Sequence, residues 1–194
     1  MSLYNTTIDF VKNATKNFDE SHDYLHAKAV YSLSKEIMDS FNFKYDEDIL
    51  ILSALLHDVR DHKYENCISE GEFLDFIRTH APNSVDIIVK IINNISYSKE
   101  AKGLREALDS PYCLYLDAIS DADRIQALGK EGIRRCEVFT RARGGKVPED
   151  VIQHCHDKLL KLLPEGYIRT DLGKDIAQGL HEEIQQYVNS YTLC

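Results

Sequence analysis

Apolar residues recur at helical spacing along almost the whole chain. In the second predicted helix, Val30, Leu33, Ile37 and Phe41 fall along one stripe, as expected for a helix with one buried face. No segment alternates apolar and polar residues convincingly in the way that a half-buried strand does. The pattern predicts an all-α fold, a compact bundle of about eight to ten helices with short connections.

Several helix boundaries can be read from local signals. Ser69 and Glu72 have the spacing of a capping box and predict a helix that ends before Pro82. Pro148 suits the first turn of a later helix. The stretch 171–191 predicts a closing helix. These signals predict where the helices lie, but not how they pack.

The length and composition predict one soluble globular domain. The 194 residues show no repeat or linker, so we expect a single domain over residues 1–194. A net charge of −9 argues against partners such as nucleic acid or an anionic membrane surface, but it does not exclude a small anionic substrate. An apolar helix face could serve a homodimer as easily as a core.

The cysteines and the N-terminus predict a cytoplasmic protein. The five cysteines are an odd number and form no C-x-x-C pair, which is typical of reduced thiols. The first residues show no basic segment followed by an apolar core, so no signal peptide is predicted. No apolar run is long enough to span a bilayer.

A His-Asp pair, His57 and Asp58, stands at the polar end of the apolar run Ile49–Leu56. A carboxylate beside a buried helix is costly unless something binds it, and a divalent cation is one good reason to keep it charged. His26 and Asp123 are suitable further ligands elsewhere in the chain. We therefore predict a site for one divalent ion, with Mn, Fe, Co or Ni favoured and Mg or Zn also compatible.

Asp61 is a candidate for proton transfer beside this site. On a continuous helix, Asp61 would lie on one face with His57 and Asp58, which precede it by four and three residues. A metal lowers the pKa of its bound water, and a carboxylate nearby can orient that water or accept its proton, typically worth ~10²–10⁴ in rate. The alternative is that Asp61 is a solvated loop residue, and the spacing does not separate the two.

The segment HDYLH mimics the H-E-x-x-H signature of zinc peptidases. His22 and His26 are four residues apart, with Asp23 in the place of the glutamate. Aspartate is one methylene shorter, and no obvious third ligand follows in the way that peptidases need. We therefore favour the interpretation that one histidine is a ligand or a core residue and the other a neighbour of the site.

Asp121 and Asp123 are expected to precede a helix. Acidic side chains at such a position usually bind the free N–H groups of the helix. One of the two can be a cap while the other turns inward as a ligand. Without the other ligands, Asp123 would not be singled out.

Basic residues concentrate between residues 130 and 146. They are Lys130, Arg134, Arg135, Arg141, Arg143 and Lys146, against Glu131 and Glu137. Arginine matches phosphate oxygens, so the region could grip a phosphate, and Lys158, four residues after His154, is a second candidate for this role. Since most charge runs are solvated helix faces, we expect only one or two of these residues to touch a ligand.

The order His26, His57-Asp58, Asp123 on an all-helical chain resembles the HD superfamily of metal-dependent phosphohydrolases. LHAKAV, SALLHDVRDHKY and DADRIQALGKEGIRR resemble the three ligand helices of that family. INNISYSKE and HCHDKLLKL resemble parts of a branch of small stand-alone enzymes. The resemblance covers roughly residues 20 to 190 and implies an HD-domain-like helical fold.

The resemblance also implies roles for single residues. The implied metal ligands are His26, His57, Asp58 and Asp123. Asp61 falls where related enzymes act on the attacking water, and Arg135 and Lys158 fall on basic positions that would bind substrate phosphates. His22 precedes the first ligand by one turn and could reach the substrate or a metal-bound water. The chain departs from the pattern of related sequences in two places, and this leaves the substrate preference open. The departures are Gln126, Lys130 and Glu131 after the last ligand, and the segment CEVFTRARGGK.

Three functions remain as hypotheses. The leading one is hydrolysis of a phosphate ester or anhydride in a nucleotide, by a monophosphatase or a pyrophosphohydrolase. The second is a nucleotide-binding or regulatory module that has lost turnover, and the third is a zinc peptidase that uses HDYLH. The chain has no P-loop, no G-x-G-x-x-G after a strand and no G-x-S-x-G elbow, which removes most sequence support for those enzyme classes.

Overall fold

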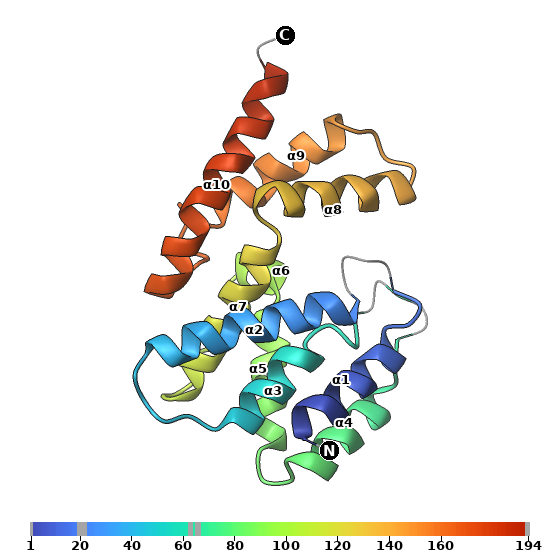
Figure 1. The fold of residues 1–194 in the computed structure, drawn as a ribbon, viewed down its shortest axis with the longest axis vertical. Coiled ribbons are helices and arrows are strands. Elements are labelled where there is room, and N and C mark those ends of the chain that lie inside the picture. The colour runs from blue at the N-terminus through green and yellow to red at the C-terminus, as the bar shows by residue number, and fades with distance from the viewer. Residues whose placement is uncertain (1, 19–22, 62–63, 65–66, 193–194) are drawn as a thin grey trace. The chain divides into compact units, whose positions relative to one another are not determined.

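The computed structural model describes residues 2–18, 23–61, 64 and 67–192. Within these residues the regular structure consists of ten α-helices and one short 3-10 helix, so the all-α prediction is confirmed (Figure 1). The helices are α1 (Leu3–Ala14), α2 (Tyr24–Ser40), α3 (Glu47–Leu56), α4 (Glu70–His80), α5 (Val85–Ile95), α6 (Tyr97–Ala101), α7 (Tyr112–Gln126), α8 (Gly129–Ala142), α9 (Glu149–Asp157), η1 (Leu159–Lys161) and α10 (Asp171–Thr192). None of the helices described is both long and apolar enough to cross a membrane.

The chain divides into two compact units, Met1–Ser120 and Asp121–Cys194. The boundary falls inside α7, so this one continuous helix begins in the first unit and ends in the second. The single-domain organisation expected from the sequence stays a prediction.

Helix α3 is the central helix of the first unit. Asp46 caps it by accepting a hydrogen bond from the Asp48 backbone N–H at 2.9 Å, and Glu47 and Asp48 add negative charge to its first turn. Every residue from Ile49 to Leu56 is buried, because α1, α2 and α5 pack around the helix (Figure 1). A helix that is apolar all round needs such an enclosed position, which fixes where its C-terminal end lies.

The apolar stripe of α2 and the boundaries of α4 agree with the sequence patterns. In α2, Val30 and Ile37 of the predicted stripe are fully buried, whereas Leu33 is half-buried. At the start of α4, the Ser69 hydroxyl accepts from the Glu72 backbone N–H, and the Glu72 carboxylate accepts from the Ser69 backbone N–H at 3.0 Å. The predicted capping box is therefore confirmed, and α4 ends at His80.

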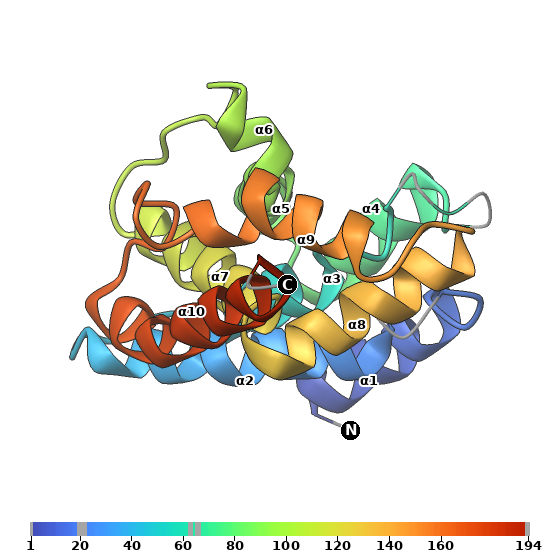
Figure 2. The same ribbon diagram turned by 90° about the horizontal axis from the view of Figure 1, so that it is seen from above.

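The second unit is built from α8, α9, η1 and α10, which pack against one another (Figure 2). The predicted closing helix is confirmed as α10. Pro148 precedes α9 as its N-cap residue, one position before the first turn in which it was expected. The difference is small, because a residue without an N–H is tolerated at either position.

A glycine at the start of α8 makes a close backbone approach. A Cβ atom on Gly132 would lie 2.1 Å from the carbonyl oxygen of Ala127. Because this neighbour is backbone, it cannot move cheaply. We expect Gly132→Ala to lower the free energy of unfolding by about 2 kcal/mol, as other overpacked sites do, measured by urea denaturation.

Gly179 supplies the matched control. It is exposed in the middle of α10, and a Cβ atom there would meet no heavy atom within 4 Å. Gly179→Ala should raise the free energy of unfolding by about 0.5–1 kcal/mol, because alanine is the better helix former. A Gly132→Ala protein as stable as the wild type would contradict the close approach.

Candidate metal centre

The His-Asp pair lies where α3 ends. His57 is the C-cap residue of α3, and the chain continues in turns in which Val59 N–H donates to Leu56 O and Asp61 N–H donates to Asp58 O at 3.0 Å. The expectation that His57, Asp58 and Asp61 share one face of a helix is therefore wrong. The helix stops at Leu56, and Asp61 follows in the turn after it.

The His57 ring has a fixed tautomer. Its Nδ1 atom lies 2.8 Å from the carbonyl oxygen of Ala54. Since a carbonyl can only accept, Nδ1 carries the proton, and the lone pair of the neutral ring lies on Nε2. Metal-binding histidines commonly have one ring nitrogen held in this way, which orients the other towards the ion.

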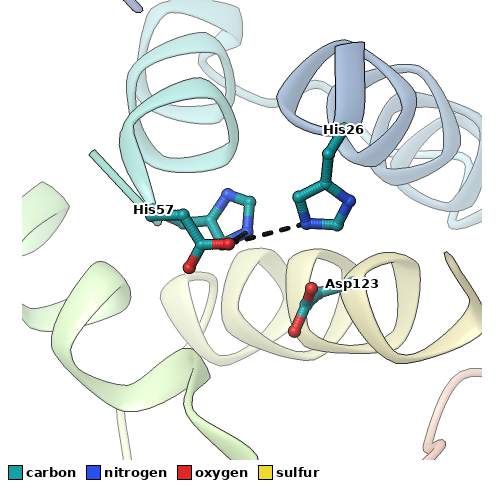
Figure 3. Close-up of side chains that lie close together, drawn as sticks. His26, His57 and Asp123 are labelled. Atoms are coloured by element: carbon teal, nitrogen blue, oxygen red, sulfur yellow. Dashed lines mark ion pairs between the residues drawn. The ribbon is translucent and has the colours of Figure 1, made fainter. Parts of the chain in front are cut away.

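The Asp58 carboxylate contacts the rings of His26 and His57, the two histidines labelled in Figure 3. Its Oδ2 atom is 3.1 Å from Nε2 of His57 and 3.6 Å from Nε2 of His26, and the two ring centroids are 5.4 Å apart. Burial raises the pKa of the Asp58 carboxyl, but His57 and His26 in their protonated forms outweigh this through charge and hydrogen bonds and hold the pKa well below its usual range. Asp58 is therefore a carboxylate at neutral pH, ready to bind a cation.

His26 is held by the first turn of α2. The helix begins at Tyr24, and the Asp23 carboxylate caps it by accepting from the backbone N–H groups of Leu25 and His26 at 2.9 and 3.1 Å. This capping role occupies the residue that would act as the base in the peptidase alternative. His22, the other histidine of HDYLH, lies outside the described residues.

Asp123 projects from the last turns of α7 (Figure 3). The expectation that Asp121 and Asp123 precede a helix is wrong, because both lie inside α7. Asp121 accepts from the backbone N–H groups of Arg169 and Thr170, which precede α10. The helix α10 is capped by Thr170, whose hydroxyl accepts from the Gly173 backbone N–H at 3.1 Å. The expected capping role is therefore not observed for either aspartate, and the ligand role of Asp123 stays a prediction.

One ligand atom from each of His26, His57, Asp58 and Asp123 lies within 4.8 Å of the others. Ligands about 2.1 Å from one ion stand at most about 4.2 Å apart, so a sub-ångström adjustment would bring this set onto a single cation. Two imidazoles and two carboxylates suit a first-row divalent metal. With the His57 lone pair and the ionised Asp58, the residues present fit such an ion.

The segment after Asp58 is anchored to α4. The Arg60 guanidinium lies 5.3 Å from the centre of the Phe73 ring and 3.7 Å from the Glu70 carboxylate. Val59 is buried in the core. These contacts hold the turn that carries half-buried Asp61. The sequence analysis did not single out Arg60. Its position two residues after the His57-Asp58 pair could have indicated that it holds this turn in place.

The predicted phosphate-binding residues lie in the second unit. Arg135 is half-buried on α8 and donates to the carbonyl oxygen of Gln126 at 3.2 Å. Lys158 ends α9 as its C-cap residue, so it does not continue the helical face of His154. The pKa of His154 is lowered, first by burial and then by the charge of Lys158.

The other basic residues of α8 fit a solvated face. Arg134 pairs with Glu131 at 2.7 Å, and Arg141 pairs with Glu137 at 3.0 Å, with both arginines exposed. Such surface pairs contribute little to stability. This agrees with the expectation that most of the charge run between residues 130 and 146 is solvent-facing.

Comparison with solved structures supports the fold. A crystal structure of Bacillus subtilis YpgQ in complex with ADP matches with a TM-score of 0.76 and 25% identity, over 97% of this chain and 93% of that one. An HD-superfamily hydrolase from Bacillus thuringiensis matches with a TM-score of 0.66 and 22% identity, over 97% and 94% of the two chains. The chain therefore has an HD-like fold, as its motifs predict.

Comparison of sequences gives the relationship. No family model matches the chain. The uncharacterized protein YpgQ of Bacillus subtilis strain 168 is 31% identical over 180 residues, which cover 88% of this chain and 83% of YpgQ. At that identity and coverage, this chain belongs to the same family as YpgQ.

Proposed function

We propose that this protein is a metal-dependent phosphohydrolase that cleaves a phosphate ester or anhydride bond in a nucleotide. The observation that carries the proposal is the group of His26, His57, Asp58 and Asp123, whose ligand atoms lie within 4.8 Å of one another. The ADP bound to YpgQ and the hydrolase with the same fold support a phosphorylated substrate.

His26, His57, Asp58 and Asp123 would hold one divalent ion, with Mn, Fe, Co or Ni favoured. When bound, such an ion acidifies water and polarises a phosphoryl oxygen. The Ala54 carbonyl keeps the His57 ring in the tautomer that binds metal.

The remaining roles belong to groups around the centre. Asp61 would accept a proton from the attacking water. It follows the His57-Asp58 pair by one turn, and its backbone N–H donates a hydrogen bond to the carbonyl oxygen of Asp58. Arg135 and Lys158 would bind substrate phosphates through charge-assisted hydrogen bonds. His22 would contact the substrate or the water.

The test is a nucleotide panel with added Mn²⁺, in which phosphate and pyrophosphate are measured separately. We expect turnover of at least one nucleotide, and the released product distinguishes a monophosphatase from a pyrophosphohydrolase. Chelation of the metal should abolish the activity, and Mn²⁺ should restore it. Nucleotide binding without turnover under any metal would instead support the regulatory module.

A further inference from the structure

Two buried charged residues stand on either side of the predicted ligand Asp123 in the sequence of α7. Asp121 is fully buried and Arg124 is 1% exposed, whereas Asp123 is half-buried. Residues three apart on a helix share a face, so Asp121 and Arg124 lie together. Asp123 lies about 200° round the helix from Asp121, because each residue advances the helix by about 100°. The ligand therefore extends from a different face of α7 than the two buried residues.

Asp121 fastens α7 to the segment that precedes α10. Its carboxylate accepts hydrogen bonds from the backbone N–H groups of Arg169 and Thr170, at 3.0 and 2.7 Å, and from the Thr170 hydroxyl at 2.8 Å. The Thr170 hydroxyl in turn accepts from the backbone N–H of Gly173, in the first turn of α10. A Cβ atom on Gly173 would lie 2.8 Å from Asp121 Oδ2, so the packing here leaves no slack.

Arg124 fastens α7 to the same segment at a second point. Its guanidinium donates to the carbonyl oxygen of Tyr167 and lies 5.9 Å from the centre of the Tyr167 ring. The segment is itself anchored in the core, because Ile168 is fully buried and its backbone N–H donates to the carbonyl oxygen of Leu162 at 3.1 Å. Asp121, Arg124 and residues 167–170 thus form a brace along one face of α7.

This brace holds the turn of α7 from which Asp123 extends. Asp123 lies three residues before α7 ends at Gln126, where the helix's own hydrogen bonds hold the backbone least. Side chains reach about 5–6 Å from a helix axis, so a rotation of about 10° would move the Asp123 carboxylate by about 1 Å. Metal–ligand distances are confined to within about 0.2 Å. A small rotation of this helix end would therefore weaken a metal site.

We propose that Arg124 and Thr170 are positioning residues for the metal ligand Asp123, an assignment that rests on the metal centre of the proposed function. Neither residue belongs to the group of four ligand residues. They fix the rotation of the end of α7 and so keep the Asp123 carboxylate at the distance that the ion requires. The affinity for a divalent ion therefore depends on a threonine hydroxyl that contacts no ligand.

The test is the binding of Mn²⁺ alone, measured by calorimetry on protein freed of metal by chelation. Thr170→Val keeps the shape of the side chain but removes its hydroxyl, and it should weaken Mn²⁺ binding by about tenfold, as loss of a group behind a metal ligand does. Thr170→Ser keeps the hydroxyl and should bind Mn²⁺ as the wild type does. Arg124→Lys keeps the charge without the planar fork, so it should also weaken binding.

Val151→Ala separates a positioning role from a general loss of stability. Val151 is fully buried in α9, in the same unit as Thr170 but outside the brace. Its truncation should lower the stability of the fold, as core substitutions of this kind do, and leave the Mn²⁺ affinity unchanged. Urea denaturation gives the stability of each variant, and affinities are compared where all are folded. If Thr170→Val does not fold, Arg124→Lys carries the same comparison.

A double-mutant cycle asks whether the Thr170 hydroxyl acts through Asp123. Asp123→Ala removes the ligand and should weaken Mn²⁺ binding more than Thr170→Val does. In the Asp123→Ala background, Thr170→Val should have no further effect on the affinity, because the group that it positions is gone. An equal loss in both backgrounds would mean that the hydroxyl acts elsewhere, and the assignment would be overturned.

The other outcomes distinguish this assignment from the proposed function. The assignment fails if the wild type does not bind Mn²⁺, if folded Thr170→Val binds it as tightly as the wild type, or if Val151→Ala weakens binding to the same extent. If Mn²⁺ binding depends on both Asp123 and Thr170 but no nucleotide is hydrolysed, the positioning role stands and the proposed hydrolase function fails.

Discussion

An Asp58→Ala variant is expected to lose its bound divalent metal and its hydrolytic activity together. Asp58 lies 3.1 Å from His57 Nε2 and 3.6 Å from His26 Nε2, so its removal takes away the carboxylate that joins the two imidazoles. Loss of a residue behind a metal ligand typically costs ~10–100-fold in affinity, and loss of a ligand itself should exceed that range. Elemental analysis and the nucleotide assay measure the two effects.

Asp61→Asn is the matched control, because it also removes one carboxylate from the same turn. Asp61 is not part of the group of four ligand residues, so this variant should keep its metal. If Asp61 accepts the proton of the attacking water, kcat should fall by about 10²–10⁴. Full metal content in Asp58→Ala would contradict the ligand assignment, and unchanged kcat in Asp61→Asn would remove Asp61 from the chemistry.

The second large effect is expected at Asp121, on the stability of the fold. This buried carboxylate accepts from the backbone N–H groups of Arg169 and Thr170 and from the Thr170 hydroxyl at 2.8 Å. Asp121→Ala would leave these buried donors without their acceptor. We expect the free energy of unfolding to fall by about 3 kcal/mol, measured by urea denaturation.

Asp171→Ala is the control for Asp121→Ala. It also removes an aspartate near the start of α10, the helix that follows the Thr170 backbone bound by Asp121. Its side chain is fully exposed and pairs with Lys174 only at 3.7 Å, so stability should hardly change. Asp121→Asn keeps the size of the side chain and should recover part of the loss. If Asp121→Ala were as stable as Asp171→Ala, the hydrogen bonds to Thr170 would not be important for the fold.

The local features of the fold could be predicted because neighbours along the chain determine them. The capping box of Ser69 and Glu72 depends on groups three residues apart, and the stripe in α2 follows from helical periodicity. The apolar run Ile49–Leu56 predicts a buried helix for the same reason. The ligand residues could be named because an ionisable pair at the end of such a run needs a partner.

Sequence reasoning failed where a helix began or ended in an unexpected place. It assumed that the helix of His57 continued to Asp61, whereas α3 ends at Leu56. It also placed Asp121 before a helix that in fact contains it. Helix ends depend on a few weak interactions, and tertiary packing outweighs them.

By itself, then, the sequence determined the all-α class, most of the helices and the residue types of a candidate metal site. Only the tertiary structure decided which distant groups meet. Asp121 binds the backbone of Thr170, 49 residues away, and the Phe18 ring stacks on Tyr64. The physical reason is that periodicity and caps act within a few residues, whereas these contacts arise only when buried helix faces pack together.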